Sequence, residues 1–269
     1  MQRNYFQGKT IIITGASSGI GKELALQLAK KGAKLALAAR NKDKLEEVAL
    51  LCSQQGTEAI AIPTDVSDKK ECKALIDKTV KQFKVIDILV NNAGITMWSY
   101  FEEIKNLDIL EKIMQVNYFG SVYCTYYALP YLKISHGQIV GVSSLTGKTG
   151  VPTRSGYGAS KHAMAGFFDT LRIELKSSGV DVTMIYPGFV STEVRERAFG
   201  GDGKPLGKSP VKEGQVMTSQ ECVKQMIPAI EKRKRELVMT FRGKAGLWLK
   251  MIAPGLVDKI ALKAIRSGR

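Results

Sequence analysis

The chain has 269 residues, of which 44% are hydrophobic and 24% charged, and this ordinary globular balance argues against disorder and against a protein with several membrane spans. Its 40 Lys and Arg against 25 Asp and Glu give a net charge of +15, which fits nucleic acid, an anionic membrane, an acidic partner or simply a soluble surface. The four cysteines are scattered without a CxxC pair, and the two histidines stand apart. We therefore expect reduced, individually buried thiols and no metal site.

Short apolar runs alternate with longer helical stretches, which is typical of a parallel sheet with helices on both faces. We predict strands at 10–14, 34–39, 59–63, 86–90, 138–142, 181–186 and 236–239, and helices at 22–31, 43–55, 67–83, 108–129, 157–178 and 220–232. Ser67 is expected to cap the third of these helices. Because no composition break resembles a linker, residues 1–242 are predicted to form a single domain, with an irregular substrate lid at about 189–216.

A glycine-rich loop joins the first predicted strand to the first predicted helix. Small residues there let the backbone approach a pyrophosphate, and the helix N-terminus offers free N–H groups and the positive end of its dipole. The position of the loop between a strand and a helix favours a dinucleotide site over a plain tight turn. The cofactor-binding residues expected in this loop are Gly15, Ser17, Ser18, Gly19, Ile20 and Gly21.

The end of the second predicted strand bears on the choice between NAD(H) and NADP(H). NAD-selective sites place a carboxylate there to bind the ribose 2′-hydroxyl. Here Ala39 is followed by Arg40 and Asn41, and a guanidinium suits a 2′-phosphate. The sequence therefore favours NADP(H), the alternative being that Arg40 is only a solvated charge at the end of the strand.

Tyr157 and Lys161 lie four residues apart and share one face of a predicted helix. An ammonium group stabilises a phenolate, so we expect Lys161 to lower the pKa of Tyr157 from ~10 toward the range of general acid–base catalysis. Ser144 follows the fifth strand, at the edge where α/β sheets bind ligands, and its hydroxyl is placed to hold a substrate oxygen against the tyrosine. The YxxxK pattern alone is weak, because such pairs are common on helix surfaces.

Five segments occur in a characteristic order: Thr14–Gly21, Asn91-Asn92-Ala93-Gly94, Ser144, Tyr157-Gly158-Ala159-Ser160-Lys161 and Pro187-Gly188-Phe189-Val190-Ser191-Thr192. Their order and spacing, over roughly residues 8–192, resemble the short-chain dehydrogenase/reductase superfamily. The resemblance implies an α/β fold: a Rossmann-type, doubly wound parallel sheet of about seven strands flanked by helices. It also implies hydride transfer between a nicotinamide and a carbonyl or alcohol.

The same resemblance assigns the remaining site residues. It implies a catalytic tetrad of Asn117, Ser144, Tyr157 and Lys161, with Ser144 rather than Ser143 as the catalytic serine. Asn117, by sequence a polar residue and a candidate kink within a predicted helix, would hold a water that links Lys161 to solvent. The residues it implies around the cofactor are Asp65 and Val66 at the adenine, Asn91, Ala93 and Gly94 beside the central strand, Tyr157 and Lys161 at the ribose, and Pro187, Gly188, Val190 and Thr192 at the carboxamide.

Residues 39–40 and 144–148 resemble the 11-beta-hydroxysteroid dehydrogenase branch, and residues 249–256 resemble the neighbouring member-seven dehydrogenase/reductases. These relatives act on steroids, retinoids or other lipid-like carbonyls and are often membrane-associated, which implies an apolar substrate. The chain departs from them because no N-terminal anchor or signal peptide is visible and no run approaches the ~18 apolar residues of a span. We expect a cytoplasmic homodimer or homotetramer that acts on a small molecule.

The C-terminal appendage, residues 243–269, mixes apolar and basic residues, and two interpretations stay open. Its helices would lie on anionic lipid as a peripheral membrane contact, or pack across a dimer or over the substrate cleft. Two rival functions also remain: a reductase of 3-oxoacyl groups on an acidic carrier, which would account for the net charge, and a cofactor-binding scaffold without turnover. Nucleic-acid binding is not expected, because the basic residues lack an aromatic platform or a recognised module.

Overall fold

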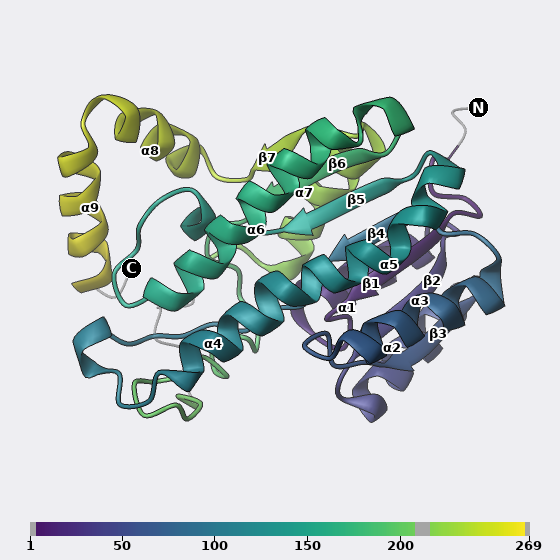
Figure 1. The fold of residues 1–269 in the computed structure, drawn as a ribbon, viewed down its shortest axis with the longest axis horizontal. Helices are drawn as coiled ribbons and strands as arrows, with labels where there is room; N and C mark the ends of the chain where they lie inside the picture. Colours follow the sequence, from purple (N-terminus) through teal and green to yellow (C-terminus); the bar gives the residue numbers. More distant parts are fainter. Residues whose placement is uncertain (1–3, 208–215, 267–269) are drawn as a thin grey trace.

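The computed structural model describes residues 4–207 and 216–266, in which a seven-stranded parallel sheet carries helices on both faces (Figure 1). The strand order is β3-β2-β1-β4-β5-β6-β7, and each neighbouring pair is parallel. The strands are β1 (Thr10–Thr14), β2 (Lys34–Ala39), β3 (Ala59–Pro63), β4 (Ile88–Asn91), β5 (Gln138–Val142), β6 (Asp181–Tyr186) and β7 (Glu236–Val238). The predicted Rossmann-type, doubly wound sheet is therefore confirmed.

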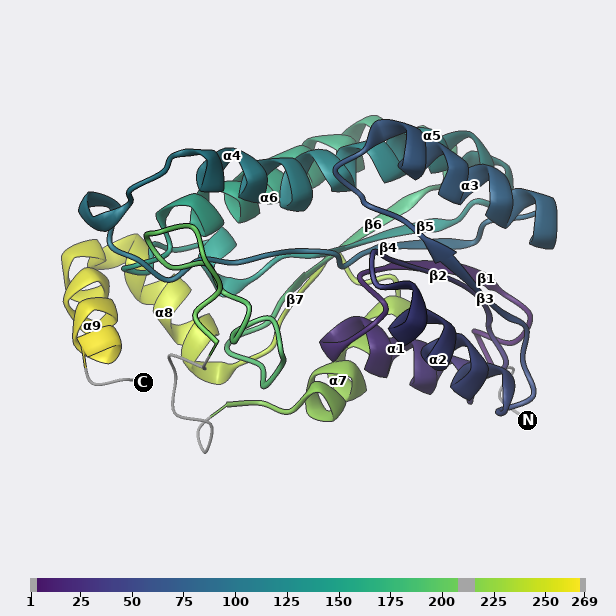
Figure 2. The same cartoon turned by 90° about the horizontal axis from the view of Figure 1, so that it is seen from below.

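Figure 2 shows the two helical layers that cover the sheet. One layer holds α1 (Gly19–Ala29), α2 (Lys42–Ser53) and α7 (Ser219–Glu231); the other holds α3 (Lys69–Phe83), α4 (Asp108–Met114), α5 (Gly120–Ser135) and α6 (Ser155–Glu174). Strand side chains alternate between two cores, since Ile11 and Ile13 pack toward the first layer and Ile12 toward the second. This coverage on both faces is the reason that β1 reads as an unbroken apolar run.

The long helix predicted at 108–129 differs from the structure in an informative way. It consists of α4, a π-helical turn at Gln115–Phe119 and α5. Such a turn adds one residue to the helix, and turns of this kind are frequent at functional sites. Asn117, the candidate kink, lies within the turn.

Two smaller expectations were wrong. The cap of α3 is Asp68, whose carboxylate accepts from the backbone N–H groups of Lys70 and Glu71, because the Ser67 hydroxyl donates to Asp65 at 2.7 Å instead. The cysteines are all free and buried as expected, but they are not all isolated, since Cys124 is hydrogen-bonded to Cys72. That bond and burial raise the pKa of the Cys124 thiol.

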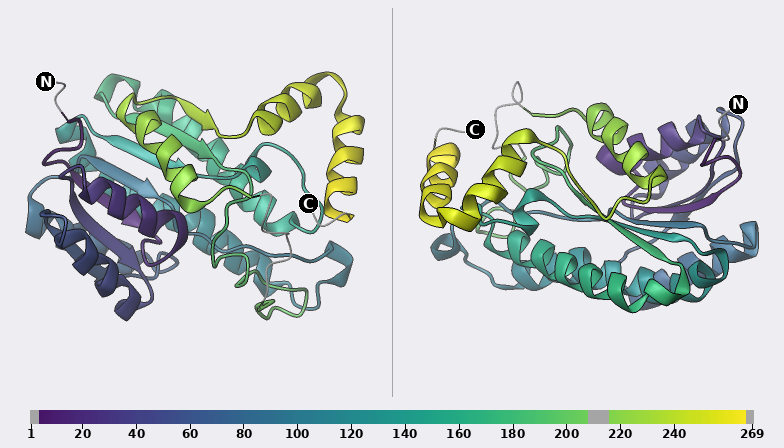
Figure 3. Two further views of the ribbon diagram at one scale, coloured as in Figure 1. Left: turned by 180° about the vertical axis from the view of Figure 1, so that it is seen from behind. Right: turned by 90° about the horizontal axis from the view of Figure 1, so that it is seen from above.

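The C-terminal appendage forms two helices, α8 (Phe241–Ile252) and α9 (Pro254–Arg266), which project beyond the sheet where β7 ends (Figure 3). Residues 208–215 of the expected lid and 267–269 of the appendage lie outside the described residues. Across 4–207 and 216–266, none of the helices combines the length and the apolar character that crossing a membrane requires.

Candidate active site

A cavity of about 1370 Å³ runs along the carboxyl edge of the sheet. Its wall is built from the segments that directly follow the strands, and the chain order of the strands reverses between β1 and β4 at its centre. This switch point is where open α/β sheets bind ligands. The expected site residues that line it are Gly15, Ser17, Ser18, Gly19, Ile20, Arg40, Asp65, Val66, Ala93, Gly94, Ser144, Tyr157, Lys161, Pro187, Gly188, Val190 and Thr192.

The glycine loop is shaped for close backbone approach. Gly15 has a φ of +67°, and a Cβ there would lie 2.8 Å from the Cα of Ala93. At Gly21 a Cβ would lie 2.3 Å from the carbonyl oxygen of Gly15. Gly21 thus lies behind the cavity wall, where it lets α1 start directly against the loop.

The start of α1 is suited to a pyrophosphate. Ser18 precedes the helix in an extended conformation, and among the described residues its side chain makes no capping hydrogen bond. The first turn carries Lys22 and no acidic residue. The backbone N–H groups and the positive end of the dipole therefore face the cavity without an intramolecular anion, which fits the phosphates of a dinucleotide.

Arg40 lies at the rim of the cavity, beyond the end of β2. Its side chain is 61% exposed, and its Nη1 is 3.9 Å from Oδ2 of Asp65, a long and weak ion pair. Lys44, on the neighbouring helix α2, pairs at 3.2 Å with Glu193 of the lid. The guanidinium group of Arg40 is therefore accessible to a ligand bound in this corner of the cavity, at the end of β2.

Asn91 lies behind the wall and not in it. Its Nδ2 donates to the Thr125 hydroxyl at 3.0 Å, so it ties β4 to α5. Its neighbour Asn92, which does line the cavity, donates to the carbonyl oxygen of Thr14 at 2.9 Å. Sequence reasoning missed this second residue, although the pair of asparagines after an apolar strand was a visible signal.

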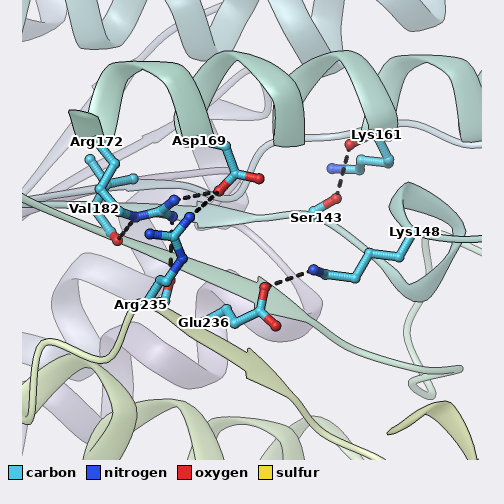
Figure 4. A network of polar contacts seen from close by, with 8 residues as sticks. All are labelled: Ser143, Lys148, Lys161, Asp169, Arg172, Val182, Arg235 and Glu236. Carbon is cyan, nitrogen blue, oxygen red and sulfur yellow. Dashed lines mark hydrogen bonds and ion pairs between the residues drawn. The ribbon is translucent and has the colours of Figure 1, made fainter. Parts of the chain in front are cut away.

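Tyr157, half-buried on the first turn of α6, interacts with the side chain of Ser144. Ser144 caps the short 3₁₀ turn Leu145–Gly147. Ser143 is turned away, because its hydroxyl donates to the backbone oxygen of Lys161 at 3.2 Å (Figure 4). The structure brings Ser144 rather than Ser143 to the tyrosine.

Lys161 is buried one turn along the same helix. Its Nζ donates to the carbonyl oxygen of Val142 at 2.9 Å and lies 5.8 Å from the centre of the Tyr157 ring. Burial lowers the pKa of Lys161 to about 8. The lysine and the tyrosine share a helix face as expected, but the ammonium group is directed at the end of β5.

The expected effect of Lys161 on the pKa of Tyr157 was wrong. Burial raises the pKa of Tyr157, and the positive charge that opposes this rise is that of Arg154. The interaction with Ser144 acts in the same direction as Arg154. A four-residue spacing fixes which face two side chains share, but not where a lysine ammonium points.

Asn117 is fully buried in the π-helical turn and does not line the cavity. Its Oδ1 accepts from the backbone N–H of Ile95 at 2.8 Å. Its Nδ2 donates to the carbonyl oxygen of Ile95 and to the Ser160 hydroxyl, both at 2.9 Å. The side chain therefore clamps the segment after β4 to α6, next to Lys161, and its water-holding role stays a prediction.

Sequence reasoning missed Arg154, which lines the cavity three residues before Tyr157 and is only 6% exposed. Its guanidinium carbon lies 4.5 Å from the ring centre of Trp98, 5.5 Å from that of Phe189 and 5.6 Å from that of Tyr157. The available signal was a cation at a helix N-terminus, where the helix dipole opposes positive charge.

Comparisons with known proteins agree with this geometry. The family described as short chain dehydrogenase matches residues 9–201. The 11-beta-hydroxysteroid dehydrogenase 1A of Arabidopsis thaliana is 37% identical over 258 residues, which are 93% of this chain and 74% of that protein. The dehydrogenase/reductase SDR family protein 7-like of Dictyostelium discoideum is 36% identical over 264 residues, 96% of this chain and 82% of that protein.

Two solved structures show the same fold and differ in cofactor. An alcohol dehydrogenase from the archaeon Thermococcus sibiricus, complexed with 5-hydroxy-NADP, has a TM-score of 0.74 and 29% identity, and the match covers 86% of this chain and 95% of that one. A short chain dehydrogenase/reductase from Burkholderia phymatum, in complex with NAD, has a TM-score of 0.82 and 25% identity, with 94% and 96% covered.

Proposed function

Because the chain belongs to the short-chain dehydrogenase/reductase family, we propose that it transfers hydride between NADP(H) and the carbonyl or alcohol group of an apolar, lipid-like substrate. Family membership makes it an oxidoreductase that acts on such groups with a nicotinamide cofactor. The observation that carries the proposal is one cavity lined both by the glycine loop and by Ser144, Tyr157 and Lys161. Glycine-loop residues, Arg40 and the segment 187–192 would hold the cofactor.

The proposed mechanism divides the work between cofactor and protein. The bound nicotinamide supplies the hydride chemistry. In reduction, the Tyr157 hydroxyl donates a proton to the substrate oxygen, while the Ser144 hydroxyl donates a hydrogen bond to it and polarises it. The raised pKa of Tyr157 keeps the phenol protonated at neutral pH, ready to act as the acid. Lys161, in its protonated form, would bind the ribose hydroxyls of the cofactor and return a proton to Tyr157, and a proton from solvent would then recharge the lysine.

Replacement of Tyr157 by phenylalanine tests the mechanism. Losing the proton donor is expected to lower kcat by about 10²–10⁴-fold, while the dissociation constant of NADPH, measured by protein fluorescence, changes little. Tyr126→Phe, on an exposed tyrosine of α5, is the matched control. Turnover of Tyr157→Phe equal to that of wild type, with any accepted carbonyl, would refute the assignment.

The exposed guanidinium of Arg40 supports the preference for NADP(H). We expect Arg40→Asp to shift the ratio of kcat/KM values for NADPH and NADH toward NADH by at least about ten-fold, because a carboxylate repels a 2′-phosphate and accepts from a 2′-hydroxyl. Lys42→Asp makes the same charge change two residues away, at a side chain that pairs with Glu46. An unchanged ratio in Arg40→Asp would contradict the preference.

The apolar character of the substrate is supported by the far wall of the cavity. Beyond Tyr157 this wall includes Val151 and Phe189, with Leu247 from α8 and Val257 and Ile260 from α9. The appendage thus lines the cleft, one of the two roles weighed for it. A panel of free ketones and aldehydes of rising apolar size, run against a 3-oxoacyl group on its acidic carrier, separates this proposal from the carrier-reductase alternative.

We also propose a peripheral membrane contact through the opposite side of the appendage. Phe241, Trp248, Met251 and Ile252 are 84%, 73%, 80% and 74% exposed, an apolar group that suits the lipid interface. Co-sedimentation with anionic liposomes is expected to fall for Trp248→Ser with Met251→Ser but not for Leu50→Ser, which changes an exposed apolar residue of α2. Unchanged co-sedimentation of the double variant would contradict the membrane contact. If light scattering showed a smaller assembly for the double variant, this face would instead be a subunit interface.

The homodimer or homotetramer stays a prediction. Tyr126 on α5 and Ile173 on α6 are 70% and 71% exposed and belong to the same helical layer, which supports a subunit contact there. Light scattering tests this contact: the double variant Tyr126→Asp with Ile173→Asp is expected to form a smaller assembly than the wild type.

A further inference from the structure

Arg154 is a desolvated cation in the wall of the cavity, only 6% exposed. Three rings, those of Trp98, Tyr157 and Phe189, surround its guanidinium group at 4.5–5.6 Å. Its Nη1 donates to the Thr96 hydroxyl at 2.9 Å. Thr153, just before it, has a φ of +68°, a conformation that a β-branched residue rarely adopts. The backbone of Thr153, the residue directly before Arg154, is therefore strained.

Two donors of this guanidinium group lack a partner. Within residues 4–207 and 216–266, neither Nε nor Nη2 of Arg154 finds a hydrogen-bond acceptor, and none of the ion pairs includes it. Aromatic rings stabilise the charge but do not accept in-plane N–H hydrogen bonds. A buried donor left without an acceptor costs about 1–3 kcal/mol, more when it is charged. Such a group in a folded protein therefore calls for an explanation.

The surroundings of Arg154 disfavour its positive charge, which an anion would stabilise. The pKa of Arg154 is lowered to about 10, mainly by burial; Tyr157 opposes this fall, and the positive charge of Arg195 contributes to it. Arg195 is itself only 5% exposed and lines the same cavity. Two buried arginines therefore line one cavity, and an anion bound to Arg154 would offset the repulsion that its guanidinium group experiences there.

We propose that Arg154 binds a carboxylate of the substrate, on the edge formed by its Nε and Nη2, beside the oxygen that Tyr157 protonates. Both donors are covered in this structure, so one of the surrounding rings has to move aside when the acid binds. Nε–H and Nη2–H point the same way and match the two oxygens of a carboxylate in a bidentate pair. The substrate class is thus an amphiphilic oxo or hydroxy acid, with its acid group near the reacting carbon and its apolar part toward α8 and α9. This assignment rests on the proposed function, whose substrate it specifies.

Matched substrates that differ only in charge test the assignment. 2-Carboxybenzaldehyde and methyl 2-formylbenzoate have the same ring and the same reacting aldehyde, each carries its acid or ester group next to the reacting carbon, and only the first is an anion. The readout is the ratio of their kcat/KM values with NADPH, in wild type, Arg154→Met, Arg154→Lys and Arg235→Met. Arg235→Met removes a positive charge outside the cavity, at a side chain that lies 3.9 Å from Asp169 (Figure 4).

Wild type is expected to favour the acid by about ten-fold or more, the size of a charged hydrogen-bond pair. Arg154→Met should bring the ratio close to one, Arg154→Lys should leave it in between because an ammonium lacks the fork, and Arg235→Met should keep it. A wild-type ratio near one, or a preference that survives in Arg154→Met, overturns the assignment while leaving aldehyde reduction, and so the proposed function, intact.

A binding measurement keeps the inference separate from turnover. The chain has two tryptophans, so in a Trp248→Phe background the fluorescence reports on Trp98, which touches the guanidinium group. Benzoate is expected to change this fluorescence and benzamide is not, and the difference should vanish with Arg154→Met. Should that variant fail to fold, the benzoate–benzamide difference in the parent protein still decides. Binding of benzoate without reduction of either aldehyde would sink the proposed function alone, and equal responses to both ligands would sink the carboxylate site.

Discussion

Replacing Asn117 with alanine removes three hydrogen bonds from a fully buried position in the π-helical turn. These bonds join its amide to the N–H and carbonyl oxygen of Ile95 and to the Ser160 hydroxyl, at 2.8–2.9 Å. Each bond contributes about 1 kcal/mol net to stability. Because the backbone groups of Ile95 are only half-buried, water can partly replace the partner that they lose. We expect the free energy of unfolding to fall by about 2–4 kcal/mol, measured by urea unfolding with far-UV circular dichroism.

Gln138→Leu is the matched control for this prediction. Gln138 is also fully buried and polar, but it donates one bond, to the Thr183 hydroxyl, and its Oε1 has no partner among the described residues. Its loss should therefore be the smaller of the two. Asn117→Asp should resemble Asn117→Ala, because a carboxylate cannot donate to Ile95. A loss below about 1 kcal/mol in Asn117→Ala, or one no larger than in Gln138→Leu, would refute the reasoning.

Three further predictions concern the cavity. Gly21→Ala places a Cβ 2.3 Å from the Gly15 carbonyl oxygen and is expected to abolish NADPH binding in a fluorescence titration. Gly166→Ala, where a Cβ would have nothing within 4 Å, is the control and should still bind NADPH. Equal binding by the two variants would contradict the predicted clash. The raised pKa of Tyr157 predicts that alcohol oxidation, which needs the phenolate, keeps rising above pH 9 while carbonyl reduction stays level through neutral pH; an oxidation plateau below pH 8 would be the opposite result. The pKa of Lys161 is about 8 in the folded chain and 10.5 ordinarily, so between these pH values the unfolded chain binds more protons than the folded one. The free energy of unfolding, measured with urea, should therefore rise with pH over this range. Lys161→Met should lack this rise.

The sheet was predictable because its causes are local. The β-branched run of β1 is buried on both faces, and a strand in that environment needs only apolar residues, which the sequence displays. The glycine loop was predictable for a similar reason, since the approach of Gly21 to Gly15 joins residues six apart. The cap of α3 shows the limit of such reasoning, because Ser67 and Asp68 are equally good caps and a bond from Ser67 to Asp65 decided between them.

The π-helical turn was only half predictable. A polar Asn117 within an apolar helix indicated an irregularity, but the extra residue is stabilised by Ile95 and Ser160, which are distant in sequence. Helical periodicity carries no information about partners of that kind. Asn117 was therefore proposed as a tetrad residue by resemblance, and its hydrogen bonds were found only by the structure.

Arg154 shows why the electrostatics of the candidate site lay beyond the sequence. A cation at the start of a helix conflicts with the local rule for helix dipoles, and such conflicts are expected at functional sites. What resolves the conflict is the pair of rings from Trp98 and Phe189, on two other segments. The sequence pairs Tyr157 with Lys161, four residues along the same helix, whereas the charge that opposes the rise in the pKa of the tyrosine comes from Arg154, which only the fold turns inward. On the proposed function, the residue that opposes the rise in the pKa of Tyr157 is also the one proposed to bind an acidic substrate, so a single substitution at Arg154 should change both properties together.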